Sequence, residues 1–179
     1  MKFFAAAVFF AGGYFFSDLQ QHLYVVPPKA VADGCPPAPA AEEQQMSFSP
    51  LSCVLHAHHW KKLPRRVSPL YLALSVLWAA EGQLGRALAA ADLAVVLELK
   101  TTLATQQQAD LLPDSLLQAY LTSPMEHPAV SSIVGGFLGQ EVLKAVSGKG
   151  APLQNIFLYD LASGDGKVEH LQAPEAAQS

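Results

Sequence analysis

The chain opens with an apolar block that two glycines interrupt. Phe3 to Phe10 and Tyr14 to Phe16 contain almost only apolar residues, and Gly12 and Gly13 lie between them. Short apolar runs bounded by turn residues are typical of buried strands. We therefore expect two buried strands joined by a Gly-Gly turn.

The same block also resembles a secretory leader, because Lys2 precedes the apolar run. Three features argue against a cleaved leader of a secreted protein: many phenylalanines, the glycine interruption, and no small-x-small cleavage site after Tyr14 to Phe16. The run is also shorter than the roughly 18 residues that a membrane span needs. Internal strands are the interpretation that we favour.

Four later segments show helical periodicity. They run from Ser68 to Gly82, from about Arg86 to Leu103, from Pro113 and Asp114 through Tyr120, and from about Pro128 to Val146. In the first, Ser68 can cap the helix and Pro69 occupies the tolerated first position. The apolar faces expected of the first three helices are Leu70, Leu74, Leu77 and Trp78, then Leu88, Ala91, Val95 and Leu99, then Leu116, Leu117 and Tyr120.

The fourth helix combines a broad apolar face with three glycines. The apolar face consists of Val130, Ile133, Val134, Phe137, Leu138 and Val142, and the glycines are Gly135, Gly136 and Gly139. A glycine inside a helix costs about 0.5 to 1 kcal/mol relative to alanine. We therefore expect Gly135 and Gly139, four residues apart, to form a groove that another backbone or a ligand approaches closely.

The other segments contain turn and linker residues. Pro27 to Pro50 holds six of the thirteen prolines, which predicts a linker or an exposed insertion. A short buried strand is expected at Leu51 to Leu55. Two strands, Ile156 to Asp160 and Lys167 to Leu171, flank a turn at residues 163–166 and predict a hairpin.

Composition narrows the classes of partner. Of the 179 residues, 51% are hydrophobic and 15% are charged, against about 25% charged in a typical soluble domain. We expect a folded domain whose surface is either sparse in charge or partly covered by a partner. The formal net charge of −4 gives no basic stripe for nucleic acid. Gln140, Glu141 and Lys144 argue against a membrane location for the fourth helix.

Cysteines and histidines do not form a recognisable metal site. Cys35 and Cys53 are the only cysteines, and they fit neither a zinc motif nor a disulfide framework. The cluster His56, His58 and His59 has no neighbouring acid or thiol to complete a metal site. A solvated strand end is the interpretation that we favour for these histidines.

The sequence lacks the common motifs for nucleotide binding and for nucleophilic catalysis. No GxGxxG or GxSxG is present, and Gly148-Lys149 lacks the upstream glycine of a phosphate-binding loop. We expect no catalytic, cofactor-binding or metal-binding residue in this chain.

The segment from His127 to Lys149 carries a family resemblance. It places glycines, Gln-Glu and lysine at the spacing G-G-x-x-x-Q-E-x-x-K, which resembles the C-terminal signature of ubiquitin-like-protein activating enzymes of the ThiF type. Five flanking segments are similar to the small subunits of heterodimeric SUMO-activating enzymes. They are residues 2–4, 13–19, 110–114, 155–160 and 164–169.

The resemblance implies an α/β fold, the C-terminal part of a ThiF-type Rossmann-like adenylation fold that ends in a β-hairpin. It divides the chain into core strands at 1–26, a linker or insertion at 27–50, an α/β region at 51–172 and a tail at 173–179. The family's N-terminal Rossmann-like half is missing, so we expect a fragment or a truncated form.

The resemblance also implies a function. In this family an E1 heterodimer adenylates a ubiquitin-like modifier with ATP. The expected partners are the large catalytic subunit, which would hold ATP and Mg²⁺, and a SUMO-type modifier. This chain would bind neither cofactor alone, would be inactive alone, and would reside in the nucleus.

The residues that match the signature are expected to serve packing and assembly only. They are Gly135, Gly136, Gly139, Gln140, Glu141 and Lys144. Two alternatives stay open: a regulatory subunit of the NEDD8-activating enzyme, and a non-catalytic interaction module that has kept the fold.

Overall fold

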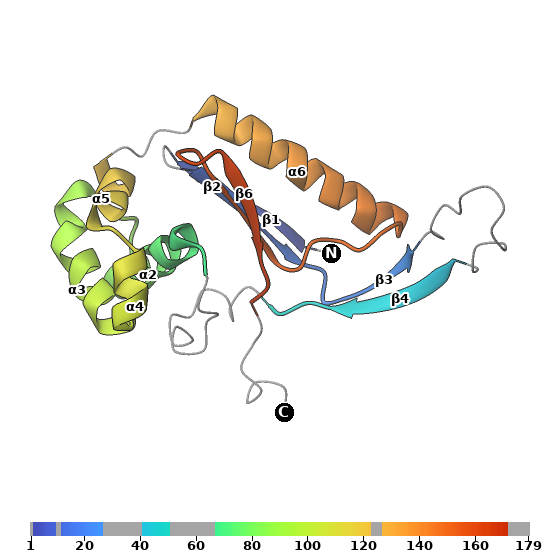
Figure 1. The fold of residues 1–179 in the computed structure, drawn as a ribbon, viewed down its shortest axis with the longest axis horizontal. Helices are drawn as coiled ribbons and strands as arrows, with labels where there is room; N and C mark the ends of the chain where they lie inside the picture. The colour runs from blue at the N-terminus through green and yellow to red at the C-terminus, as the bar shows by residue number, and fades with distance from the viewer. Residues whose placement is uncertain (1, 10–11, 27–40, 51–66, 123–126, 172–179) are drawn as a thin grey trace.

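The computed structural model describes residues 2–9, 12–26, 41–50, 67–122 and 127–171 (Figure 1). The strands are β1 (Lys2–Phe9), β2 (Gly12–Asp18), β3 (Gln21–Val26), β4 (Glu42–Ser47), β5 (Ile156–Asp160) and β6 (Asp165–Glu169). The helices are α2 (Pro69–Leu84), α3 (Leu93–Leu103), α4 (Gln106–Leu111), α5 (Asp114–Thr122) and α6 (Pro128–Ser147), with a 3-10 turn at Ala90–Asp92.

Four strands form an antiparallel sheet in the order β1-β2-β5-β6. Successive side chains of a strand point to opposite faces. In β2, Phe15 therefore packs with Val130 and Val134 of α6, whereas Phe16 packs in the larger core with α2. Figure 1 shows α6 along one face of the sheet and α2 to α5 gathered into a separate helical group. The mixed α/β class expected from the sequence is confirmed, with antiparallel strands.

The expected Gly-Gly turn is wrong. Gly12 and Gly13 are the first two residues of β2 and pair with Asp160 and Tyr159 of β5. A Cβ atom on Gly12 would overlap the main-chain oxygen of Tyr159. Close approach between strands, rather than a turn, explains why a glycine stands at position 12.

The segment Pro27 to Pro50 was expected to be a linker or an exposed insertion, but its residues 42–47 form strand β4. β4 pairs with β3 in a two-stranded ribbon, and Tyr24 Oη donates to Gln44 Oε1 at 2.8 Å. Main-chain bonds from Val25 to Gly148 and Gly150 tie the ribbon to the end of α6. β4 is mostly exposed, so it lacks the apolar alternation by which strands are recognised in sequence.

Helix α2 is the central core helix. Every residue from Leu70 to Leu77 is buried, which is more than the one apolar face that was expected. The helix passes Gly82 and ends at Gly85, which adopts the left-handed conformation at φ 65° and donates its N–H to Glu81 O. Ser68 occupies the N-cap position, but its side chain makes no capping hydrogen bond.

The second helix is shorter than expected and buries a different face. It begins at Leu93, after the 3-10 turn, and its fully buried residue is Val96, whereas Ala91 is exposed. The polar stretch after Leu103 forms α4, and Thr105 N donates to Gln108 Oε1 at 3.0 Å at its start. This capping pattern signals a helix start in a segment that hydrophobic periodicity alone does not mark.

The remaining helices and the final hairpin follow the sequence expectation. α5 buries Leu117 and Leu121, and α6 covers the expected range. β6 begins at Asp165, two residues earlier than expected, after a turn in which Gly164 has φ 71°. The strand at 51–55, the histidine cluster, both cysteines and the C-terminal tail lie outside the described residues.

Within the described part of the chain, α6 is the one helix long and apolar enough to cross a membrane by length and composition alone. The core helices of soluble proteins meet the same criterion. Its packing against β1 and β2 and its buried Val130 and Val134 give it a role in the core of this fold.

Substitution of Gly12 by Ala should destabilise the protein by about 1 to 3 kcal/mol, because the new methyl group meets the β5 main chain rather than a movable side chain. The free energy of unfolding from urea titrations measures the effect. The matched control is Gly135→Ala on α6, where a Cβ meets nothing within 4 Å. That variant should be stabilised by about 0.5 to 1 kcal/mol. Equal stabilities of the two variants would contradict the role of Gly12.

Candidate functional site

Helix α6 carries the six signature residues, and the structure divides them between two faces. Val130, Val134, Glu141 and Ala145 form the buried face. At one flank, the Phe137 ring stacks on Phe157 at a centroid distance of 4.6 Å. Phe157 in turn stacks on Phe15 at 5.2 Å, so an aromatic column links α6 with β5 and β2.

Glu141 joins α6 to the loop that leads into β5. Its side chain is 7% exposed. One carboxylate oxygen accepts a hydrogen bond from Leu153 N at 2.5 Å, and the other lies 2.6 Å from Lys144 Nζ. A buried carboxylate is tolerated when it is paired and hydrogen-bonded, as here. Glu141 and Lys144 therefore lie where a packing role would place them, at the contact between α6 and the loop before β5.

The signature glycines lie on the opposite, exposed face of α6. A Cβ atom built at Gly135, Gly136 or Gly139 meets nothing within 4 Å. The close approach expected at Gly135 and Gly139 is therefore not made by any described residue of this chain. Gln140 is exposed as well, and Leu143 and Val146 are 69% and 70% exposed. An assembly role for this face stays a prediction.

Asn155 is a buried polar residue whose structural role the sequence analysis missed. It is fully buried, its side-chain nitrogen donates to Leu171 O at 2.6 Å, and its side-chain oxygen accepts from Leu171 N at 3.0 Å. Its main-chain oxygen accepts from Ser17 N at 2.7 Å. Asn155 thus holds the end of the hairpin against β2. In the sequence, Asn155 directly precedes the apolar run of β5, and a polar residue at such a position is expected to be buried with its hydrogen bonds made.

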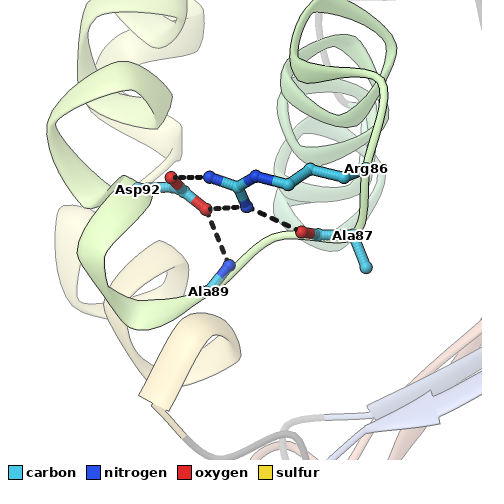
Figure 2. A network of polar contacts seen from close by, with 4 residues as sticks. All are labelled: Arg86, Ala87, Ala89 and Asp92. Carbon is cyan, nitrogen blue, oxygen red and sulfur yellow. Dashed lines mark hydrogen bonds and ion pairs between the residues drawn. The ribbon is translucent and has the colours of Figure 1, made fainter.

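Arg86 and Asp92 form a second polar network, at the start of α3 (Figure 2). Arg86 Nη1 and Nη2 each donate to one carboxylate oxygen of Asp92 at 2.7 Å, and Ala89 N donates to Asp92 Oδ2 at 2.8 Å. The hydrogen bonds from Arg86 and then from Ala89 lower the pKa of Asp92 to about 2. The network fixes the loop between α2 and α3, which explains why the helix begins at Leu93 rather than near Arg86.

Within the described ranges, no group of three or more His, Cys, Asp or Glu residues could hold a metal ion. The polar groups described above connect elements of the fold, and none of them forms a nucleophile paired with a base. Glu141 and Lys144 of α6 lie in a packing contact between that helix and the loop before β5, and an assembly role for α6 stays a prediction.

Comparisons with known proteins give a consistent result. The chain is 45% identical to SUMO-activating enzyme subunit 1A of Arabidopsis thaliana over 63% of its own length and 36% of that relative. It is 30% identical to SUMO-activating enzyme subunit 1 of Danio rerio and 29% identical to that of Mus musculus. These two matches cover 97% and 96% of the chain but 56% and 55% of the relatives. The chain therefore spans about half the length of these vertebrate relatives. No family model matches it.

Removal of the Glu141 carboxylate should loosen the junction between α6 and β5. We expect Glu141→Ala to lower the free energy of unfolding by about 1.5 to 3 kcal/mol, because it leaves Leu153 N and Lys144 without their charged partner. Chemical denaturation followed by circular dichroism measures the change. The neighbouring variant Gln140→Ala is the control, since its exposed side chain should change stability by less than about 0.5 kcal/mol. A loss of similar size in both variants would show that the carboxylate is not the cause.

The Arg86–Asp92 pair predicts a specific pH dependence. Because the pKa of Asp92 is lowered when folded, the pair stabilises the fold above the ordinary carboxyl pKa of about 3.9, and this contribution is lost as the pH falls towards about 2. The melting temperature of Asp92→Asn should therefore lie below that of the parent at pH 6, and the gap should close between about pH 4 and pH 2. A gap that stays constant down to pH 2 would contradict this assignment.

Proposed function

Because this chain is a homologue of SUMO-activating enzyme subunit 1 over about half of that subunit's length, we propose that it acts as the non-thioester subunit of a SUMO-activating E1 heterodimer. The observation that supports the proposal is the breadth of the match. Similarity to the vertebrate subunits covers 96% to 97% of the chain, which includes the sheet, the helical group and α6.

In the proposed assembly, ATP and Mg²⁺ bind to the large subunit, which also carries the catalytic cysteine. Two helix N-termini among the described residues are poorly suited to bind phosphate, which supports this placement. The two longest helices begin with Pro69 and Pro128, which lack an N–H donor, and the Ser68 N–H is bound to Glu169 Oε1 at 2.8 Å. We therefore assign no adenylation step to residues of this chain.

In the proposed heterodimer, this chain contributes a binding surface for the large subunit. The exposed side of α6 presents Gly135, Gly136 and Gly139 together with Leu143 and Val146, none of which is charged. Small residues on a helix let a second backbone approach closely, and exposed apolar side chains favour burial in an interface. The SUMO-type modifier and residence in the nucleus belong to the same proposal.

A second candidate is a non-catalytic interaction module. It is favoured by one observation: the exposed side of α6 offers an uncharged surface that suits binding whether or not adenylation follows. Such a module would bind the large subunit without supporting SUMO adenylation.

Co-expression with the large SUMO-activating subunit of Arabidopsis thaliana tests both candidates. We expect a complex that stays together on gel filtration and supports SUMO-dependent ATP–pyrophosphate exchange. Binding without exchange would favour the interaction module. No complex, under conditions in which Arabidopsis subunit 1A does form one, would overturn the proposal, and a complex with the large NEDD8-activating subunit alone would favour the NEDD8 alternative.

A paired substitution tests the α6 face within that experiment. Gly139→Arg places a long side chain into open space, so the isolated chain should fold normally while its affinity for the large subunit falls at least about tenfold. Gln118→Arg on the exposed side of α5 is the control and should leave affinity unchanged. Equal affinities of the two variants would show that the glycine face is not the contact.

A further inference from the structure

A cavity of about 630 Å³ lies between the helical group and the final hairpin. Its walls come from the start of α2, from residues 111–119 and from residues 158–167. Leu70, Leu116 and Leu158 supply apolar walls. The volume is within the range of about 300 to 1,000 Å³ that is usual for ligand pockets in proteins.

Two segments that were singled out for their family resemblance meet at this cavity. Leu111 and Pro113 belong to the segment 110–114, and Asp165 and Lys167 belong to the segment 164–169. No role in packing the core accounts for these residues, because all four are exposed. The proposed function of the chain does not use the cavity.

The charge at the edge of the cavity is unbalanced. Asp160 and Asp165 face each other as register partners in the hairpin, and like charges directly opposite destabilise a sheet. The carboxylate of Asp160 accepts hydrogen bonds from Ala162 N and Ser163 Oγ, which are neutral donors. Among the described residues, the recorded ion pairs involve Asp92, Asp114 and Glu141 and neither of these two acids.

One cation lies nearby on the same face of the hairpin. Lys167 is opposite Leu158, two positions along from Asp165, and it also lines the cavity. A single lysine offsets one of the two carboxylates, so the lining keeps a net negative charge. A ligand that enters the cavity therefore gains most if it combines an apolar group with a cation.

We propose that this cavity binds a short extended peptide segment of a partner protein in which an apolar residue and a lysine or arginine stand two positions apart, so that both side chains point to the same side of the segment. The apolar side chain fills the space between Leu70, Leu116 and Leu158. The basic group lies against Asp160 and Asp165, where it removes the repulsion between them. The hydroxyl of Ser115, which also lines the cavity, faces the main chain of the segment.

A fluorescently labelled peptide in which leucine and lysine stand two positions apart, separated by serine, is the probe, and fluorescence anisotropy with the full chain is the measurement. We expect saturable binding that weakens as salt increases, and no binding of the matched leucine and glutamate peptide. Asp165→Asn should weaken binding by about threefold, as expected for loss of one exposed charge contact. Ser115→Trp, which places a large side chain into the cavity from an exposed position, should weaken it at least about tenfold.

Control variants keep the result interpretable. Glu98→Gln removes an exposed acid on α3 and should leave peptide binding unchanged, and thermal melts establish that each variant is folded. Equal binding of the lysine and glutamate peptides, or binding unaffected by both Asp165→Asn and Ser115→Trp, would overturn the proposal. Binding that emerges only after Lys61, Lys62, Arg65 and Arg66 are replaced by serine would also overturn it, because the chain itself would then be the ligand. The assay needs no E1 partner, so its failure leaves the proposed subunit role untouched.

Discussion

The pairing of β2 with β5 is the contact on which the rest of the described structure depends. It joins the start of the chain to its last quarter and places Phe15 opposite Phe157 and Tyr14 opposite Leu158. One face of this pair receives α6 through the aromatic column, and the other receives α2. Because the two strands approach so closely at Gly12, the position has no room for a side chain. The two larger hydrophobic clusters are therefore organised around one strand interface.

Buried polar groups fix the alignment of the packed elements, which apolar contacts alone do not determine. Hydrophobic contact is not directional, so α6 could shift along its sheet at modest cost. The carboxylate of Glu141 bonds a loop nitrogen, and the amide of Asn155 bonds both main-chain groups of Leu171, so each specifies one alignment. Glu169 has a comparable role, since its carboxylate holds the first residue before α2. Three side chains thus connect four segments that are distant in sequence.

Sequence patterns predicted the elements that carry apolar runs, apolar residues at helical spacing or turn residues, and they missed β4 and α4, which do not. The opening strands were predicted from continuous apolar runs, α2, α5 and α6 from apolar residues at helical spacing, and the final hairpin from its turn residues. β4 was missed because a ribbon exposed on both sides has no such apolar pattern, and α4 because its start depends on a side-chain cap. At the candidate site, Glu141 and Lys144 were expected to serve packing, and in the structure they lie at the contact between α6 and the loop before β5. The close approach was placed at Gly135 rather than at Gly12, since spacing in a helix cannot tell which face of it is covered.

The long separation between β2 and β5 along the chain has a consequence for synthesis in the cell. β2 leaves the ribosome well before β5, and at roughly 5 to 20 residues per second its partner follows only after about ten seconds. During that interval β2 has β1 beside it but lacks β5, so one edge of β2, the strand that carries Phe15 and Phe16, is open. An exposed apolar edge strand is a template for aggregation. The nascent chain is therefore expected to depend on chaperones until its last quarter has been made.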